Sequence, residues 1–152
     1  MVATIGSIVH ILAATIWVGG MFFAYLILRP ATAAMEPGPR LLLWSGVLGR
    51  FFAWVIAAIV LLLLSGFGMV FGVYGGFAKL ALSINLMMGL GIIMMLAFFH
   101  IYFAPYRRFR AAIAREDWSE GARQLAQIRA IVAINLALGL ITVAIGGSGK
   151  SW

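Results

Sequence analysis

The residues best suited to chemistry lie on one face of the first apolar stretch of the chain. His10, Trp17 and Met21 are separated by seven and four residues, so a helix places them on the same side. Imidazole nitrogen and thioether sulfur are both metal ligands, and the thioether suits Cu(I). An imidazole within an apolar stretch is costly unless it has a partner or a function. Two interpretations of His10 stay open: a ligand to a metal ion or haem iron, or a buried ring hydrogen-bonded to a neighbouring helix.

A second group of soft ligands follows later in the chain. Met87 and Met88 lie seven residues before Met94 and Met95, so each member of the first pair stacks over one of the second. Met69 falls in the apolar stretch between the two groups. These methionines could form a path for Cu(I), but thioethers also fill gaps in apolar packing. The pattern alone does not separate the two interpretations.

Other polar groups in the apolar stretches indicate further roles. Lys79 either extends to the membrane surface or supplies positive charge to an anionic group such as a porphyrin propionate. In a haem b site, His10 would bind the iron with Trp17 and Lys79 beside it. His100 lies near the opposite membrane surface from His10, so one small site cannot use both. We predict structural roles for His100 and Arg129, and hydrogen bonds between helices for three others: Asn85, Asn135 and Thr142.

Four long apolar stretches must position these residues. They run approximately over 4–28, 51–73, 78–104 and 128–145, each near the length that crosses about 30 Å of hydrocarbon. Of the 152 residues, 64% are hydrophobic and 10% are charged, which excludes an ordinary soluble domain. We predict an all-α polytopic membrane protein, a single domain over 1–152 that forms an antiparallel bundle of four transmembrane helices. With extramembrane extensions, the helices are expected at 4–28, 40–73, 78–115 and 118–146.

Local signals refine these boundaries. Pro30 should stop the first helix, and we expect that helix to belong to the mature protein because no basic residue precedes its apolar run. Asp117 and Glu120 match a capping box at the start of the last helix. Tyr106 and Phe109 should face the bilayer surface.

The basic residues predict an orientation. Nine arginines lie in the two connections that follow the first and third stretches, whereas only Lys79 and Lys150 lie on the other side. The positive-inside rule therefore places both connections in the cytoplasm and both termini outside. This distribution favours the lipid bilayer, and no nucleic acid, as the partner of the basic residues. All four acidic residues lie in the same connections, and cysteine is absent. A pump that uses a buried carboxylate, a disulfide and a thiolate metal site are thus disfavoured or excluded.

Three segments of this chain resemble the CopD-like copper-resistance membrane proteins. They are 10–30, with its His-x6-Trp-x-Gly-Gly pattern at His10, and the segments 100–108 and 127–139. The resemblance implies a non-enzymatic protein of the bacterial inner membrane, with periplasmic termini, that binds or moves copper ions. It also implies a periplasmic copper-binding partner. His10 and Met21 would form an outer-half Cu(I) site, with the later methionines as further steps. Small residues on the helix faces also permit a homo-oligomer.

The chain is more distantly similar to the HemJ-type protoporphyrinogen oxidases, four-helix redox enzymes that hold haem b. Their early histidine corresponds to His10, and the lysine that opens their third helix corresponds to Lys79. This sequence also departs from many CopD-like relatives, because Asn85 stands where they carry a further histidine. A third hypothesis is a structural helper subunit whose polar residues only join helices.

Overall fold

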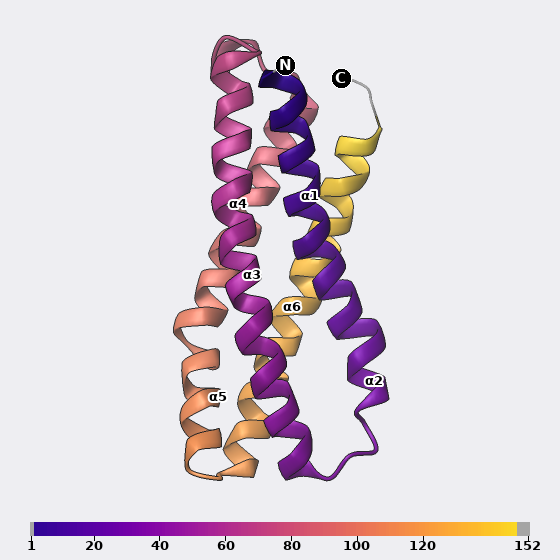
Figure 1. Cartoon of the computed structure of the whole chain (residues 1–152), viewed down its shortest axis with the longest axis vertical. Coiled ribbons are helices and arrows are strands. Elements are labelled where there is room, and N and C mark those ends of the chain that lie inside the picture. The colour runs from indigo at the N-terminus through magenta and orange to yellow at the C-terminus, as the bar shows by residue number, and fades with distance from the viewer. Residues whose placement is uncertain (1, 149–152) are drawn as a thin grey trace.

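Four helices long and apolar enough to cross a membrane make up the described part of the chain, residues 2–148 of a computed structural model. They run over Ala3–Ala31, Pro37–Gly72, Leu82–Ala114 and Trp118–Gly147, and no strand occurs among the described residues. The predicted all-α membrane bundle is confirmed, and the protein is a multi-pass membrane protein. The start of α1 and the end of α6 lie together at one end of the bundle, opposite the two arginine-rich connections (Figure 1).

The first and third spans are each divided into shorter elements. The first comprises α1 (Val2–Phe22), the π-helix η1 (Phe23–Leu28) and α2 (Arg29–Ala31). The second is the single helix α3 (Pro37–Gly72), which the short 3-10 helix η2 (Phe77–Lys79) follows. The third comprises α4 (Leu82–Phe103) and α5 (Pro105–Ala114), and the last is α6 (Trp118–Gly147).

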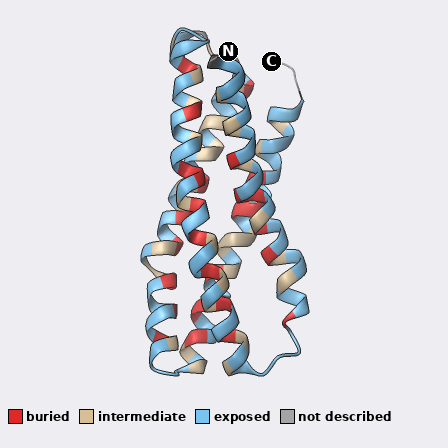
Figure 2. Cartoon of the chain, in the orientation of Figure 1, coloured by how far each residue is buried: buried red, intermediate tan, exposed pale blue. Residues whose placement is uncertain are grey.

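The four spans pack mainly in two pairs, the first with the second and the third with the fourth. α3 packs along α1, whereas α4 and α5 pack along α6, and α1 also contacts α6. The consecutive helices α3 and α4 hardly approach each other. Buried residues therefore follow the inner faces of the helices, and the outer faces stay exposed (Figure 2). Apolar side chains such as Trp54, Leu64 and Leu96 are more than 60% exposed, as expected of a surface that contacts lipid.

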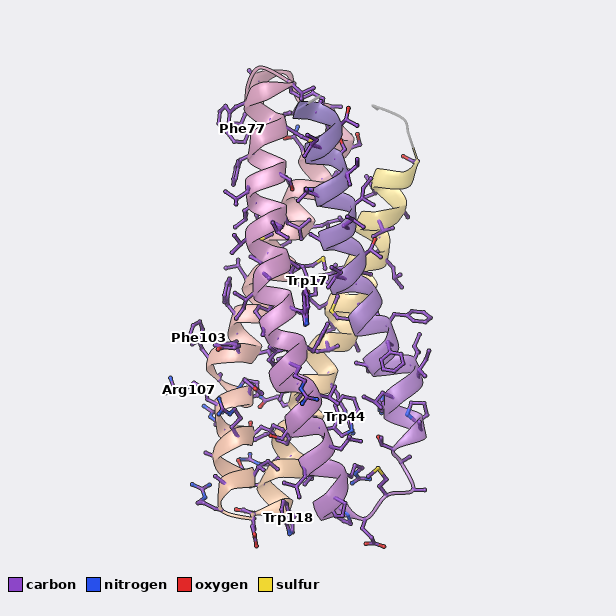
Figure 3. The ribbon with its side chains drawn as sticks, viewed as in Figure 1. Trp17, Trp44, Phe77, Phe103, Arg107 and Trp118 are labelled. Carbon is purple, nitrogen blue, oxygen red and sulfur yellow. The ribbon has the colours of Figure 1, made fainter. Side chains whose placement is uncertain are left out.

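A cluster of aromatic rings connects α3 to the other helices. Phe52 of α3 lies edge-to-face against Phe98 of α4, with ring centroids 5.3 Å apart, and against Tyr106 of α5 at 4.7 Å. Phe98 in turn contacts Trp17 of α1 at 6.3 Å. Trp17 lies deep in the middle of the bundle (Figure 3). Large aromatic side chains thus connect α3 and α4 where the two backbones are too far apart to pack directly. Edge-to-face contacts of this kind are favourable.

Pro30 does not stop the first helix, so that prediction is wrong. A π-helical segment, Phe23–Leu28, precedes it and helical structure continues to Ala31. Proline lacks the N–H that an α-helix needs, and its ring clashes with the carbonyl four residues earlier. The wider π turn shifts the pattern of backbone hydrogen bonds just before the proline. The helix therefore continues through Pro30 and ends one residue later, at Ala31.

The third predicted helix, 78–115, starts later than expected and is broken once along its length. Its start moves to Leu82, because Gly75 and Gly76 adopt φ angles of 72° and 110° and η2 follows them. Gly tolerates such positive φ angles without strain. It also breaks at Ala104, directly before Pro105, since a residue before proline is disfavoured in the helical conformation.

Two side-chain predictions near this end also need correction. Tyr106 and Phe109 are 6% and 0% exposed, so they face the interior of the bundle and not the bilayer surface. α5 packs on α6 and α3, which covers these rings. The capping box is half formed. Asp117 accepts a hydrogen bond from the Glu120 N–H at 3.0 Å, but the Glu120 carboxylate turns to Arg123 and Gln124.

Candidate metal-binding site

His10 faces α3 across the contact between the first two spans. Its Nδ1 lies 2.9 Å from the hydroxyl of Ser65, and the ring is half-buried. Gly66 makes room for it, because a Cβ at that position would lie 3.5 Å from the imidazole Cε1. The ring is thus held at the inner side of α1, between two helices.

The hydrogen bonds around Ser65 favour one tautomer of the imidazole. The Ser65 hydroxyl donates to the carbonyl of Leu61, one turn earlier in α3, at 2.6 Å. In the tautomer that fits this bond, the Ser65 oxygen accepts from His10 and Nδ1 carries the hydrogen. The remaining nitrogen, Nε2, then has a free lone pair. A neutral imidazole fixed through one nitrogen by a hydrogen bond is the usual form of a metal-binding histidine.

The thioether of Met69 lies about one helical turn further along the contact between α1 and α3. The Ser7 hydroxyl donates to the sulfur of Met69 at 3.4 Å, and Gly6 leaves space for that side chain. Ser7 precedes His10 by three residues in α1, and Met69 follows Ser65 by four in α3. Since the helices are antiparallel, the two pairs are successive levels of one contact, about one helical turn or 5.4 Å apart. The structure therefore places His10 and Met69 at neighbouring levels of the α1–α3 contact. We call this pair the outer His–Met site.

Met21 does not share this site. It is 2% exposed and lies eleven residues after His10 in the same α-helix, about 16 Å further along its axis. Trp17, also 2% exposed, lies between the two levels in the aromatic cluster. The expected pairing of His10 with Met21 in one small site is thus not formed, although both residues lie on the inner side of α1.

The methionines of α4 point mainly to another helix. Met87 lies over Gly146 of α6, and Met94 lies over Gly139, where an added Cβ would come within 3.0 and 3.1 Å of their methyl carbons. Met94 is 3% exposed, whereas Met88 and Met95 are half-buried. These contacts with Gly146 and Gly139 place Met87 and Met94 between α4 and α6, away from the outer His–Met site. Gap-filling over glycine accounts for these two side chains.

The remaining polar residues mostly bond locally. Only Asn135 makes the predicted bond between helices, from its Nδ2 to the carbonyl of Met94 at 3.2 Å. Asn85 donates to the carbonyls of Leu80 and Ala81 beside it, and Thr142 donates to Leu138 in its own helix. These nearby carbonyls are reached without any partner helix, which corrects the prediction for both residues.

The other predicted polar positions are near the arginine-rich end or outside the described side chains. His100 is exposed on α4. The Arg129 guanidinium lies over the ring of Trp44, 4.8 Å from its centroid, and Trp44 donates to Thr32 at 3.2 Å. This contact lies in the lower part of the bundle, where Figure 3 labels Trp44. The side chain of Lys79 lies outside the described part, so its predicted role stays a prediction.

Ser65, Ser7 and Gly66 are the site residues that the sequence did not reveal. Their only signal is the pairing of two spacings, Ser7 to His10 and Ser65 to Met69, on two helices that must first be aligned. Among the described residues there is no group of three or more His, Asp or Glu side chains that could hold a metal ion. The arrangement therefore resembles the low-coordinate nitrogen and sulfur ligand sets that suit Cu(I), and not a carboxylate-rich site.

A known family model matches a large part of this chain. The family model CopD, copper resistance protein D, matches residues 45–148, about two thirds of the chain. The match includes α4 and α6, and it begins after α1, so His10 lies outside it. No curated protein and no solved structure matches the chain.

Proposed function

The chain belongs to the CopD family of copper resistance proteins, and on that premise we propose that it binds copper ions in the bacterial inner membrane and takes part in their movement. The observation that supports this proposal is that His10, which Ser65 holds, and Met69, which Ser7 contacts, lie at successive levels of the α1–α3 contact. The copper ion is the cargo of the protein in this proposal, and Cu(I) is the form that imidazole and thioether ligands favour.

The role of each residue follows from its contacts. Ser65 fixes the imidazole, His10 supplies nitrogen and Met69 supplies sulfur from the opposite helix. Ser7 and His10 lie in the first half of α1, so the site lies towards the end of the bundle where α1 begins. If that end faces the periplasm, as the basic residues predict, a periplasmic copper-binding protein could deliver the ion there. The methionines of α4 would be later steps in any path.

The haem alternative receives no comparable support. The imidazole lies against the backbone of Gly66 and the side chain of Ser65. Both residues belong to α3, which packs along α1. The family match concerns copper resistance.

Titration of the purified protein with Cu(I) against a coloured chelator in detergent tests this proposal. We expect one high-affinity ion in the wild type, and at least about tenfold weaker binding in both His10→Ala and Met69→Leu, since each removes a ligand. Met21→Leu is the matched control, because Met21 lies about 16 Å away and should leave the affinity unchanged. Equal affinity in His10→Ala and the wild type would refute the outer His–Met site.

A further inference from the structure

A hollow of about 420 Å³ opens between α3 and the junction of α4 with α5. Its α3 wall is made of small residues, among them Gly46 and Gly49, and its other wall includes Tyr102 and Tyr106. A Cβ at Gly46 would meet nothing within 4 Å, and one at Gly49 would lie 3.4 Å from the Tyr106 hydroxyl. The missing side chains thus create the space, and the aromatic cluster around Phe52 keeps the two walls apart.

Two positive charges border this hollow. Arg50 comes from α3 and Arg110 from α5, and both side chains are exposed. The Arg110 guanidinium lies 6.0 Å from the centroid of the Tyr106 ring, which orients it along the same wall. Within residues 2–148, the only ion pair joins Arg123 to Glu120, so neither arginine has a carboxylate partner. The hydroxyls of Tyr102 and Tyr106 make no hydrogen bond in the same part of the chain and are free to donate.

The hollow also has an apolar side. Ala53 and Ile56 of α3 continue its wall towards the middle of the bundle, where the predicted apolar stretch 51–73 lies. Arg50 is therefore at the boundary between the hydrocarbon and the arginine-rich end. Phosphate groups of lipids are the abundant anions at this depth, and guanidinium groups bind phosphate through paired hydrogen bonds.

We infer that this hollow binds a phosphate group, with Arg50 and Arg110 on either side of it and the two tyrosine hydroxyls as further donors. The apolar wall indicates an anionic phospholipid as its source, whose acyl chain follows Ala53 and Ile56 between α3 and α4. This site is distinct from the outer His–Met site, because Arg50 and His10 lie towards opposite ends of the α1–α3 pair.

Native mass spectrometry of the purified protein tests the inference. Phosphatidylglycerol or phosphatidylcholine is titrated in detergent, and the retained lipid is measured. We expect the wild type to prefer phosphatidylglycerol, and the preference to fall about fivefold for each of Arg50→Gln and Arg110→Gln. Gly46→Leu should also abolish it, because the leucine fills the hollow without changing any charge.

Two matched variants separate a built site from general attraction. Arg107→Gln removes an exposed arginine of α5 that does not line the hollow and points outward (Figure 3). Gly68→Leu adds the same side chain to α3 at a place where a Cβ also meets nothing within 4 Å. Both should retain the wild-type preference. An equal loss in Arg107→Gln, or an unchanged preference in Gly46→Leu, would overturn the inference.

Inorganic phosphate distinguishes the two sources of the anion. If the site belongs to a lipid, millimolar phosphate should neither raise the melting temperature of the wild type nor displace phosphatidylglycerol. Phosphate that stabilises the wild type, but not the Arg50→Gln/Arg110→Gln variant, would support the phosphate site and assign it to a soluble anion.

Discussion

At the scale of single residues, one hydrogen bond prepares His10 for binding. Ser65 accepts from Nδ1 and leaves Nε2 with its lone pair. Ser65→Ala should therefore weaken Cu(I) binding by about tenfold although no ligand is lost, because a residue that orients a metal ligand typically contributes this much. The chelator competition used for the wild type measures the change.

Two further serine variants make this prediction specific. Ser65→Thr keeps the hydroxyl and should restore most of the affinity. Ser83→Ala removes a buried serine hydroxyl from α4 and should leave the affinity as it is. If Ser65→Ala binds copper as tightly as the wild type, Ser65 does not orient the imidazole.

The sequence predicted only part of this site. The helical period placed His10, Trp17 and Met21 on one side of α1, and the buried positions of Trp17 and Met21 agree with that. The period gives the face of a helix but not the partner at each level along it. Met69 could be matched to His10 only after α1 and α3 were aligned, so the sequence favoured the nearer but wrongly spaced Met21.

At the scale of elements, glycine decides how closely α1 and α3 approach. A Cβ at Gly20 would overlap the ring of Phe51, whereas one at Gly19 would meet nothing within 4 Å. We expect Gly20→Ala to lower the free energy of unfolding by about 1–2 kcal/mol. The added methyl group would overlap the Phe51 ring, and the cost of this overlap exceeds the stability that alanine adds through its higher helix propensity. Gly19→Ala should leave it unchanged or raise it by up to about 1 kcal/mol.

Unfolding in mixed detergent micelles, followed by circular dichroism, compares these neighbouring variants. If both are equally stable, the Phe51 ring turns aside without cost and Gly20 does not set the distance between the helices. The same contact carries the outer His–Met site, so a loss of stability in Gly20→Ala should be accompanied by weaker copper binding.

The elements themselves were largely predictable, and their interruptions were not. Long apolar runs specify four spans, because a bilayer requires about twenty apolar residues for each. The passage of the chain through Pro30 was missed because a π turn at Phe23–Leu28 has no simple sequence signal. Tyr106 was misplaced for a different reason. An aromatic residue near the membrane surface is often an interfacial anchor, but here α3 and α6 cover it.

At the scale of the whole molecule, the charges predict which end faces which compartment. The connection between α2 and α3 and the one between α5 and α6 lie together, and the nine arginines lie in or near these two connections along the chain; the turn between α3 and α4 lies at the other end, with the start of α1. The positive-inside rule assigns the first end to the cytoplasm. The outer His–Met site would then open towards the periplasm and the proposed phosphate site towards the cytoplasm.

The absence of cysteine makes this orientation directly measurable. Single cysteines are introduced as Met35→Cys, in the connection after α2, and as Tyr74→Cys, since both side chains are exposed. In intact spheroplasts, a membrane-impermeant maleimide should label Tyr74→Cys, and it should label Met35→Cys only after lysis. The cysteine-free parent gives the background. The reverse pattern would place the arginines outside and His10 near the cytoplasm, and copper would then have to reach this site from within the cell.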